Sequence, residues 1–254
     1  MTQVVQVATR DRVRVLTLNR PAARNALSGE LISALYSALL TADADERVSV
    51  IVLTGADPAF CAGVDLKEFA RDGQEYLARF DAEDCIRQVA LMSKPVIGAI
   101  NGATFTGGLE MALGCDLLIA SDRAVFADTH VRVGVLPGGG MTARLSRRVG
   151  SAQARRLSLT GEVVDAAAAL RIGLVTEVVP HEQVLSHTLD VAGSIAEVEL
   201  GLLHPLKQQY TEGDDATLAF ALNREREIAA ATAIAFDQLE QRQQAVMSRN
   251  RERL

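Results

Sequence analysis

Apolar and polar positions alternate with two different periods along this chain, and the two periods predict strands and helices in turn. The segments 3–8 and 12–18 alternate with a period of two and carry many Val and Leu residues, which predicts an opening β-hairpin. Ser28 is a suitable N-cap for a helix that runs to about residue 41, with apolar residues at four-residue intervals on one face. The short apolar run 48–53 then predicts a buried strand.

The same alternation of helix and strand continues through the middle of the chain. Residues 74–92 have a helical pattern, and the dipeptide Lys94-Pro95 predicts that this helix has ended before it. Apolar runs at 96–100 and 117–120 predict two further strands, and 173–179 predicts a last one. Strands that alternate with helices are typical of an α/β core, which is the fold class we expect.

The character of the sequence changes after about residue 199. From residue 214 to the end, apolar residues are spaced as on helix faces and stand among many charged residues, without strands of their own to cover. Such a region has to pack on the core or on a neighbouring subunit. We therefore expect a core over 1–199 that holds the functional site, followed by a helical C-terminal region over 200–254.

The amino-acid composition restricts the kinds of binding partner that we expect for this protein. The chain has 254 residues, 48% of them hydrophobic, which permits a substantial core. Its net charge of -6 argues against a broad nucleic-acid-binding face and against attraction to an anionic membrane, although a basic pocket for a phosphorylated ligand could be hidden by that average. Aromatic residues make up 4% of the chain and Trp is absent, so base-stacking surfaces are not expected.

Cysteine usage and the N-terminus indicate a cytoplasmic protein. Three scattered Cys residues form no CxxC or Cys/His cluster, and the His residues lack the spacing of zinc ligands, so we expect reduced thiols and no metal. The N-terminus lacks the basic-then-apolar layout of a signal peptide. No uncharged apolar run approaches the roughly 18 residues that a transmembrane helix needs.

Two glycine-containing segments are the most informative part of the chain. Residues 60–66 (FCAGVDL) and 101–110 (NGATFTGGLE) each follow a strand-like run, and each opens into a helix. The start of a helix has free backbone N–H groups, which stabilise an anion or a developing oxyanion. Two such donors on one carbonyl oxygen would form an oxyanion hole, and Glu110, set among apolar neighbours, suits general acid–base catalysis. Taken alone, each segment also fits an ordinary strand-to-helix turn.

Several further motifs stand in order along nearly the whole chain. With the glycine segments they are RPAARNAL at 20–27, AGVDL at 62–66, KPVIGAING at 94–102, GGLE at 107–110, CD at 115–116, GVLPGGG at 134–140 and GLV at 173–175. Together they resemble the crotonase family of enoyl-CoA hydratases and isomerases. The resemblance implies a spiral of repeated ββα units and a C-terminal helical region that packs against other subunits, usually as a homotrimer or a hexamer of two trimers. It also implies an acyl-CoA thioester substrate and no metal or redox cofactor, since CoA arrives as part of the substrate.

The resemblance also assigns roles to particular positions. It places the oxyanion hole at the backbone N–H groups of Val64 and Gly107, and it matches Glu110 to one of the two catalytic glutamates of the family's hydratases. The positions that match residues near the CoA moiety are Arg24, beside the phosphates, and Ala62, Gly63, Asp65 and Leu66, beside the adenine and pantetheine.

One position departs from the family pattern. The family's hydratases hold a water molecule between two glutamates, and the second of these aligns with His130. Histidine can donate or accept a proton near neutral pH, so a pair of Glu110 and His130 could still add water. His130 could equally mark another reaction on the same enolate, or be a loop histidine bonded to backbone. Asp128 is a nearby acid, which would point to the same side only if the segment is extended.

The function predicted from the sequence and the resemblance is hydration of the α,β double bond of an enoyl-CoA thioester. Glu110 would act as the base towards water, and His130 or a group near it would supply or share the α-proton. Three alternatives stay open: a double-bond isomerase or another crotonase-type acyl-CoA reaction, an acyl-CoA-binding protein without turnover, and a structural α/β module without a ligand. The segment 138–143 also fits a GxGxxA dinucleotide fingerprint, but no clear βαβ unit follows it, so nucleotide binding is not expected. The segment 68–90 is expected to shape the acyl pocket, although its side chains, Tyr76 among them, define no size.

Overall fold

The computed structural model of the protein describes residues 3–231, 244 and 247–248, and the strands in this part of the chain form two sheets. The larger sheet has the order β1 (Val5–Arg10), β2 (Val13–Leu18), β3 (Val50–Gly55), β5 (Val96–Ile100), β7 (Leu117–Ser121) and β10 (Glu177–Val179). The hairpin of β1 and β2 is antiparallel, and the other neighbouring pairs of this sheet are parallel. The smaller sheet has the order β4 (Ala59–Cys61), β6 (Ala103–Phe105), β8 (Val125–Ala127) and β9 (Val164–Asp165).

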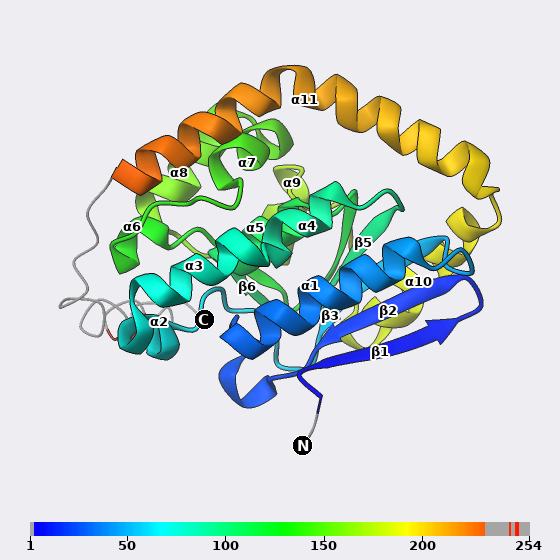
Figure 1. Cartoon of the computed structure of the whole chain (residues 1–254), viewed down its shortest axis with the longest axis horizontal. Coiled ribbons are helices and arrows are strands. Elements are labelled where there is room, and N and C mark those ends of the chain that lie inside the picture. Colours follow the sequence, from blue (N-terminus) through cyan, green and yellow to red (C-terminus); the bar gives the residue numbers. More distant parts are fainter. Residues whose placement is uncertain (1–2, 232–243, 245–246, 249–254) are drawn as a thin grey trace.

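The chain repeats one unit: a strand in the larger sheet, a strand in the smaller sheet, and then a helix. β3 and β4 are followed by α2 (Leu66–Asp72), β5 and β6 by α5 (Gly107–Leu113), and β7 and β8 by α6 (His130–Val133). Successive units lay their strands side by side in parallel, so the chain advances as a spiral (Figure 1). The expected α/β fold of ββα units is confirmed, and because β4, β6 and β8 are parallel, each unit starts its helix at the same edge of the smaller sheet.

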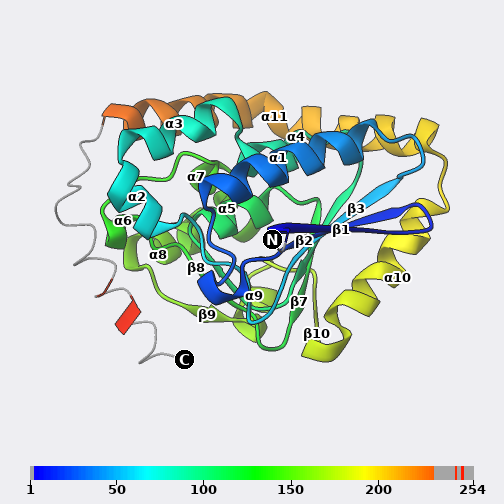
Figure 2. The same cartoon turned by 60° about the horizontal axis from the view of Figure 1, so that its bottom comes forward.

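Helices cover both faces of the larger sheet. α1 (Gly29–Ala44) packs on β1 and β2, and α4 (Cys85–Leu91) packs on α1 and α5. α10 (Val184–Ala196) lies on the opposite face, against β2, β3, β5 and β7 (Figure 2). Because both faces are covered, β3 and β5 are buried along their whole length, which explains why their sequences are almost continuously apolar.

The remaining described helices complete the outer layer. They are η1 (Pro21–Ala23), α3 (Gln74–Ala82), α7 (Met141–Val149), α8 (Ser151–Thr160), α9 (Ala166–Arg171), η2 (His181–Gln183) and α11 (Leu200–Ala231). α11 runs as an arc along one edge of the molecule and packs on α7 (Figure 1). Apart from residues 244 and 247–248, the expected helical region beyond residue 231 lies outside the described residues. Its contact with other subunits stays a prediction.

Two predicted elements differ from the structure. The helix expected over 74–92 is two helices, α3 and α4, because the carboxylate of Asp84 accepts the Arg87 N–H at 2.8 Å and starts a new helix there. The strand expected over 173–179 is shorter. Gly173 has a φ of +76° just after α9, and extended pairing with β7 begins only at Glu177.

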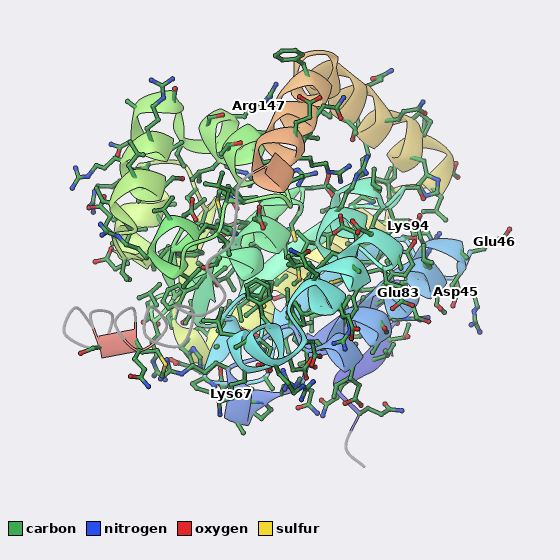
Figure 3. The ribbon with its side chains drawn as sticks, turned by 60° about the vertical axis from the view of Figure 1, so that its left-hand side comes forward. Asp45, Glu46, Lys67, Glu83, Lys94 and Arg147 are labelled. Atoms are coloured by element: carbon green, nitrogen blue, oxygen red, sulfur yellow. The ribbon has the colours of Figure 1, made fainter. Side chains whose placement is uncertain are left out.

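Lys94 fastens the end of α1 to the start of β5. Its side chain is buried, and its Nζ donates to the carbonyl oxygens of Ala42 at 2.9 Å and Asp45 at 2.7 Å. Figure 3 labels Lys94 and Asp45 on the same side of the molecule. These carbonyls belong to the end of α1, where backbone oxygens lack partners and a cation is favourable. The Lys94-Pro95 dipeptide therefore positions β5, and with it the glycine segment that follows β5 and β6.

Candidate active site

The first glycine segment turns sharply between β4 and α2. Gly63 has a φ of +92°, a left-handed conformation that residues with side chains disfavour. Its carbonyl oxygen accepts the Leu27 N–H at 2.8 Å, and the Asp65 N–H donates to the Leu27 carbonyl oxygen at 3.3 Å. Val64 is thus framed by two hydrogen bonds to a single residue. In such a parallel bridge the N–H of the framed residue points away from the partner strand, so the Val64 N–H faces away from Leu27.

Tyr76 holds the same turn from α3. Its side chain is fully buried, its hydroxyl donates to the carbonyl oxygen of Leu27, and the same hydroxyl accepts the Asp65 N–H at 3.1 Å. Burial raises the pKa of the Tyr76 phenol, so the hydroxyl stays protonated and keeps its donor. Arg20 adds an ion pair to Asp65 at 3.0 Å. Sequence spacing gave no signal for this role of Tyr76, because the contact joins residues that are far apart in the chain.

The second glycine segment lies directly against the first. It begins α5 at Gly107, after Thr106 with a φ of +53°. A Cβ built on Gly63 would lie 3.2 Å from the Gly107 nitrogen, so the two segments touch. A Cβ on Gly108 would lie 2.2 Å from the carbonyl oxygen of Cys61, so α5 can pack this closely on β4 only with glycine at that position.

The predicted oxyanion donors therefore lie on touching segments. In the part of the chain that the structure describes, no backbone hydrogen bond outside regular helices and strands is donated by Val64 or Gly107. The Thr106 side chain makes no capping hydrogen bond at the start of α5. Both N–H groups keep the capacity to donate to a ligand atom, which is what an oxyanion hole requires.

Glu110 stands in the first turn of α5 and is held by backbone donors. Its Oε1 accepts the Gly139 N–H at 2.9 Å and the Met141 N–H at 3.1 Å, and the residue is only 3% exposed. Gly139 and Met141 belong to the segment that fits a dinucleotide fingerprint in the sequence. In the structure this segment contacts the Glu110 carboxylate, with a φ of +113° at Gly140 before α7 begins. The sequence did not predict that this segment holds the Glu110 carboxylate in place.

His130 joins Glu110 to a second carboxylate. Its Nε2 lies 3.5 Å from Glu110 Oε2, and its Nδ1 lies 2.7 Å from Asp128 Oδ1. The His130 N–H also donates to Asp128 Oδ1, at 3.2 Å. The segment is not extended here, because Thr129 has a ψ of 12° and α6 starts at His130. From the sequence, Asp128 is expected to point to the same side as His130 only in an extended segment. In the structure Asp128 reaches the ring through this turn instead.

The two carboxylates keep the imidazole charged. Burial by itself lowers the pKa of His130, but the charge of Glu110 and the hydrogen bond with Asp128 outweigh it and raise the pKa to about 10. Burial acts to raise the pKa of Asp128, yet the bond to His130 dominates and the pKa of this carboxyl is lowered. At neutral pH the site therefore holds an imidazolium between two carboxylates, with Nε2–H directed towards Glu110.

The positions expected near CoA gather at the start of the first glycine segment. The carbonyl oxygen of Arg24 accepts the Ala62 N–H at 3.0 Å, and the Arg24 side chain is exposed. Asp65 caps α2 by accepting two N–H groups of its first turn at 3.2 and 3.3 Å, and Leu66 begins that helix. The structure brings these positions together beside Gly63, while their contact with CoA stays a prediction.

A second set of hydrogen-bonded side chains consists of a serine, a histidine and an aspartate and does not include Glu110. Ser121 Oγ is 3.0 Å from His181 Nδ1, and His181 Nε2 is 3.1 Å from Asp57 Oδ2. Ser121 is fully buried and its Oγ already accepts the Arg123 N–H at 3.0 Å, so it ties β7 to η2 and is no nucleophile. Among the described residues there is no cluster of His, Cys, Asp and Glu that could bind a metal, and no helix is long and apolar enough to span a membrane.

Comparisons with known proteins identify the family of this chain. The family model for enoyl-CoA hydratase/isomerase matches residues 8–248. A probable enoyl-CoA hydratase of Rhizobium meliloti is 41% identical over 89% of this chain and 88% of the relative, and the 2,3-dehydroadipyl-CoA hydratase of Escherichia coli is 36% identical over 87% of each. The crystal structure of an enoyl-CoA hydratase from Mycobacterium paratuberculosis superposes with a TM-score of 0.81 at 49% identity, over 90% of this chain and 96% of that one. The chain therefore belongs to the enoyl-CoA hydratase/isomerase family, which is the crotonase family that its motifs resemble.

Proposed function

We propose that this protein is an enoyl-CoA hydratase, a lyase that adds water across the α,β double bond of an acyl-CoA thioester. The observation that carries the proposal is the 3.5 Å contact between His130 Nε2 and Glu110 Oε2, next to two touching glycine segments. Relatives with this activity in their names, at 41% and 36% identity over most of the chain, support the same reaction.

The thioester carbonyl oxygen would accept the N–H groups of Val64 and Gly107. Charge develops on this oxygen when a nucleophile attacks the β-carbon, so donors fixed in place beforehand stabilise the transition state more than the ground state. A single donor of this kind contributes roughly 10²–10³ in kcat in enzymes where it has been removed. The CoA moiety would run along the first glycine segment, past Ala62, Gly63, Asp65 and Leu66, with its phosphates near Arg24.

Glu110 and His130 would each carry out one of the two proton transfers of the reaction. The oxygen of water bonds to the β-carbon while one of its protons passes to the Glu110 carboxylate, and the π electrons shift towards the α-carbon and the thioester oxygen. Protonated His130 then gives its Nε2 proton to the α-carbon. Direct contact between the two side chains lets the proton on Glu110 return to His130, which restores both groups for the next cycle.

Crotonyl-CoA turnover tests the proposal. Loss of the conjugated enoyl absorbance with a product heavier by one water is the expected result. We expect Glu110→Ala and His130→Ala to cut turnover sharply while CoA-ester binding, measured by calorimetry, survives. A product of unchanged mass would reassign the protein to double-bond isomerisation, and tight binding without any product would make it a binding protein. Full turnover in His130→Ala would remove His130 from the mechanism.

We further infer a homotrimer or a hexamer of two trimers, in the cytoplasm, with no metal or redox cofactor. Hydration leaves oxidation states balanced within substrate and water, and side chains of this chain serve both proton transfers, so the chemistry asks for no further group. Light scattering of the purified protein tests the assembly. Unchanged turnover after treatment with a chelator tests the absence of a metal.

A further inference from the structure

The hydroxyl groups of Thr106 and Thr129 form a buried hydrogen bond between the two helices that carry the candidate catalytic side chains. Their Oγ1 atoms lie 2.6 Å apart, and each residue is only 5% exposed. Thr106 is the N-cap of α5, the helix that bears Glu110, and Thr129 is the N-cap of α6. Because α6 begins with His130, this hydrogen bond joins the starts of the two catalytic helices.

A threonine at an N-cap usually accepts a backbone N–H of its own helix through the side-chain oxygen. In the described part of the chain, neither Thr106 nor Thr129 makes such a capping bond. Their carbonyl oxygens still take part in the helices: that of Thr106 accepts the Glu110 N–H at 3.0 Å. That of Thr129 accepts the Val133 N–H at 3.1 Å. The two hydroxyls thus bond to each other across the site and not within their own helices.

Thr106 occupies a backbone conformation that suits glycine. Its φ is +53° and its ψ is -116°, and a β-branched side chain is strongly disfavoured at a positive φ. The other described non-glycine residues with a positive φ are Asp11, Arg24 and Asn25, none of which is β-branched. Such strain persists only where the surrounding contacts hold it, and it often marks a functional site. Glycine would relieve the strain but would lack the hydroxyl that bonds to Thr129.

Thr106 also touches the other parts of the site. Its N–H donates at 3.0 Å to the carbonyl oxygen of Ala127, at the end of β8, the strand that leads to α6. A Cβ built on Gly63 would lie 3.2 Å from the Cβ of Thr106, so this side chain packs against the first glycine segment. Gly107, whose N–H is a predicted oxyanion donor, follows Thr106 directly. Thr106 therefore stands where both glycine segments and the approach to α6 meet.

We propose that Thr106 and Thr129 are positioning residues for the reaction, and that their hydrogen bond sets the distance between the oxyanion donors and His130. This inference rests on the proposed hydratase function. In that reaction the thioester oxygen lies at the Gly107 N–H while the α-carbon of the same substrate receives the Nε2 proton of His130. Both conditions are met together only if α5 and α6 keep one relative position. Small displacements at a reacting centre reduce rates by large factors, so a fixed distance between the two helices raises kcat.

The experiment replaces each threonine with valine, which keeps the shape but removes the hydroxyl, and with serine, which keeps the hydroxyl. The variants are Thr106→Val, Thr129→Val, the double variant of these two, Thr106→Ser and Thr129→Ser. The matched control is Thr188→Val, because Thr188 is fully buried in α10 and its hydroxyl donates to the Val184 carbonyl oxygen at 2.6 Å. Thermal melts select a temperature at which the assayed variants are folded. The two valine variants remove the same bond from opposite sides, so either one suffices if the other does not fold.

With crotonyl-CoA, each single valine variant is expected to lower kcat by roughly 5- to 50-fold and to leave KM within about 3-fold, because one hydroxyl is lost and its partner is left buried and unpaired. The double variant should lie within about 3-fold of the slower single variant, since all three lack the same bond. The serine variants and the Thr188→Val control should stay within about 3-fold of the wild-type kcat.

Four results would overturn the proposal. They are a wild-type kcat in either folded single valine variant, a double variant that recovers the wild-type kcat, losses that multiply in the double variant, and serine variants that lose as much activity as the valine variants. A bond that only stabilised the fold would lower the melting temperature of the valine variants without lowering the kcat of the folded protein.

A binding measurement separates failure of this inference from failure of the hydratase function. Acetoacetyl-CoA can bind as an enolate, which places negative charge on the thioester oxygen, whereas butyryl-CoA is saturated and forms no such enolate readily. We expect the valine variants to weaken calorimetric binding of acetoacetyl-CoA by roughly 5- to 50-fold and to leave butyryl-CoA within about 3-fold. If the wild-type protein turns over no enoyl ester, the hydratase function is wrong, and a selective loss for acetoacetyl-CoA still supports the positioning role. Equal changes for the two esters, or a wild-type protein that binds neither, overturn it.

Discussion

Replacing Asp128 with Asn tests whether the carboxylate behind His130 keeps the imidazole charged. Asn keeps an oxygen that can accept the Nδ1 hydrogen bond, which is 2.7 Å long in the wild-type protein, but it carries no charge. Asp128 is 2% exposed and His130 is 5% exposed, so water screens the lost charge very little. The variant therefore changes the electrostatics of the site while it preserves its shape.

The size of the effect follows from the strength of the lost interaction. A hydrogen bond to a charged group contributes about 1.5–3 kcal/mol. Because about 1.4 kcal/mol corresponds to one pKa unit, the pKa of His130 should fall by about one to two units. Glu110 still lies 3.5 Å from Nε2 and retains its part of the upward shift. From a wild-type pKa of about 10, the variant is expected at about 8 to 9.

The assay is the pH dependence of kcat/KM for crotonyl-CoA, corrected for loss of the thioester without enzyme. This parameter reports ionisations of the free enzyme, and the proposed mechanism needs His130 protonated. Activity should fall on the alkaline side near pH 10 in the wild-type protein and at about pH 8 to 9 in the variant. Asp165→Asn is the matched control, because Asn also serves well as the N-cap of α9. The reasoning would be refuted if kcat/KM of Asp128→Asn fell at the same alkaline pH as that of the wild-type protein, or if the wild-type value already fell near pH 6.5.

The same variant has a second readout, in folding. The pKa of His130 is raised from 6.5 to about 10 in the folded protein, so the folded state binds this proton more tightly than the unfolded state does. The resulting contribution to the free energy of unfolding is complete below pH 6.5 and is lost as the pH rises through about 10. Thermal melts across this range should lose less stability in Asp128→Asn than in the wild-type protein.

Three further substitutions test the parts of the site separately. Glu110→Gln keeps the acceptor oxygen but not the base, and should lower kcat by about 10²–10⁴ with the calorimetric Kd of a CoA ester unchanged; equal kcat would exclude Glu110 as the base. Tyr76→Phe loses two buried hydrogen bonds, so urea denaturation should show a free energy of unfolding lower by about 1–3 kcal/mol. Because the turn at Val64 is then held less firmly, kcat should decrease by a larger factor than KM changes. Gly108→Ala forces a Cβ to within 2.2 Å of a carbonyl oxygen of β4 and should destabilise by about 1–3 kcal/mol, whereas Gly193→Ala, with nothing within 4 Å, should not; similar losses in both would refute the packing argument.

Much of the site could be predicted because its parts are local. Glycines that allow a tight turn, a helix that begins just after a strand, and Glu110 one turn into that helix all lie within a few consecutive residues. The prediction of His130 as the partner of Glu110 came from its place in the ordered family motifs. The structure places the two side chains 3.5 Å apart, while their catalytic roles stay predictions. The roles of Val64, Gly107 and the CoA-facing positions stay predictions, although the structure brings their segments into contact.

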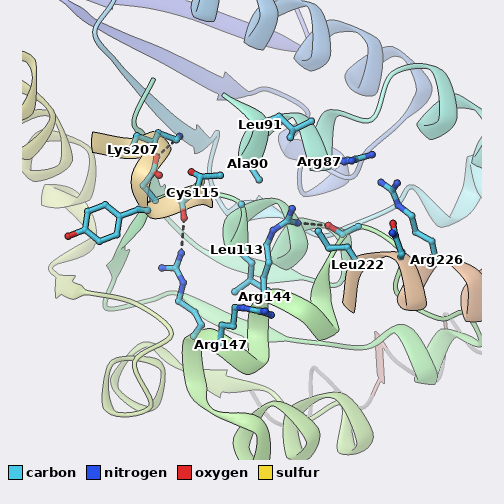
Figure 4. Close-up of a pocket in the computed structure, with 18 residues that line it drawn as sticks. Arg87, Ala90, Leu91, Leu113, Cys115, Arg144, Arg147, Lys207, Leu222 and Arg226 are labelled. Carbon is cyan, nitrogen blue, oxygen red and sulfur yellow. Dashed lines mark hydrogen bonds and ion pairs between the residues drawn. The ribbon is translucent and has the colours of Figure 1, made fainter. Parts of the chain in front are cut away.

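Other features had no local signal. Tyr76 reaches Asp65 only because α3 folds back over the first glycine segment, and Gly139 reaches Glu110 only because the chain after α6 returns to α5. A pocket lined by Arg87, Arg144 and Arg226 is likewise assembled from α4, α7 and α11, which are far apart in the sequence (Figure 4). No periodicity in any one segment encodes such contacts.

The sequence by itself determined the family and the alternation of strands and helices, and it singled out Glu110 as the candidate catalytic carboxylate, because neighbouring residues set turns, caps and apolar faces. Only the tertiary structure decided that His130 carries a charge between two carboxylates, that Tyr76 holds the Val64 turn, and that the N–H groups of Gly139 and Met141 hold the Glu110 carboxylate. The physical reason is distance along the chain. Burial and charge at these points depend on how the ββα units pack against one another, and that packing is a property of the whole fold.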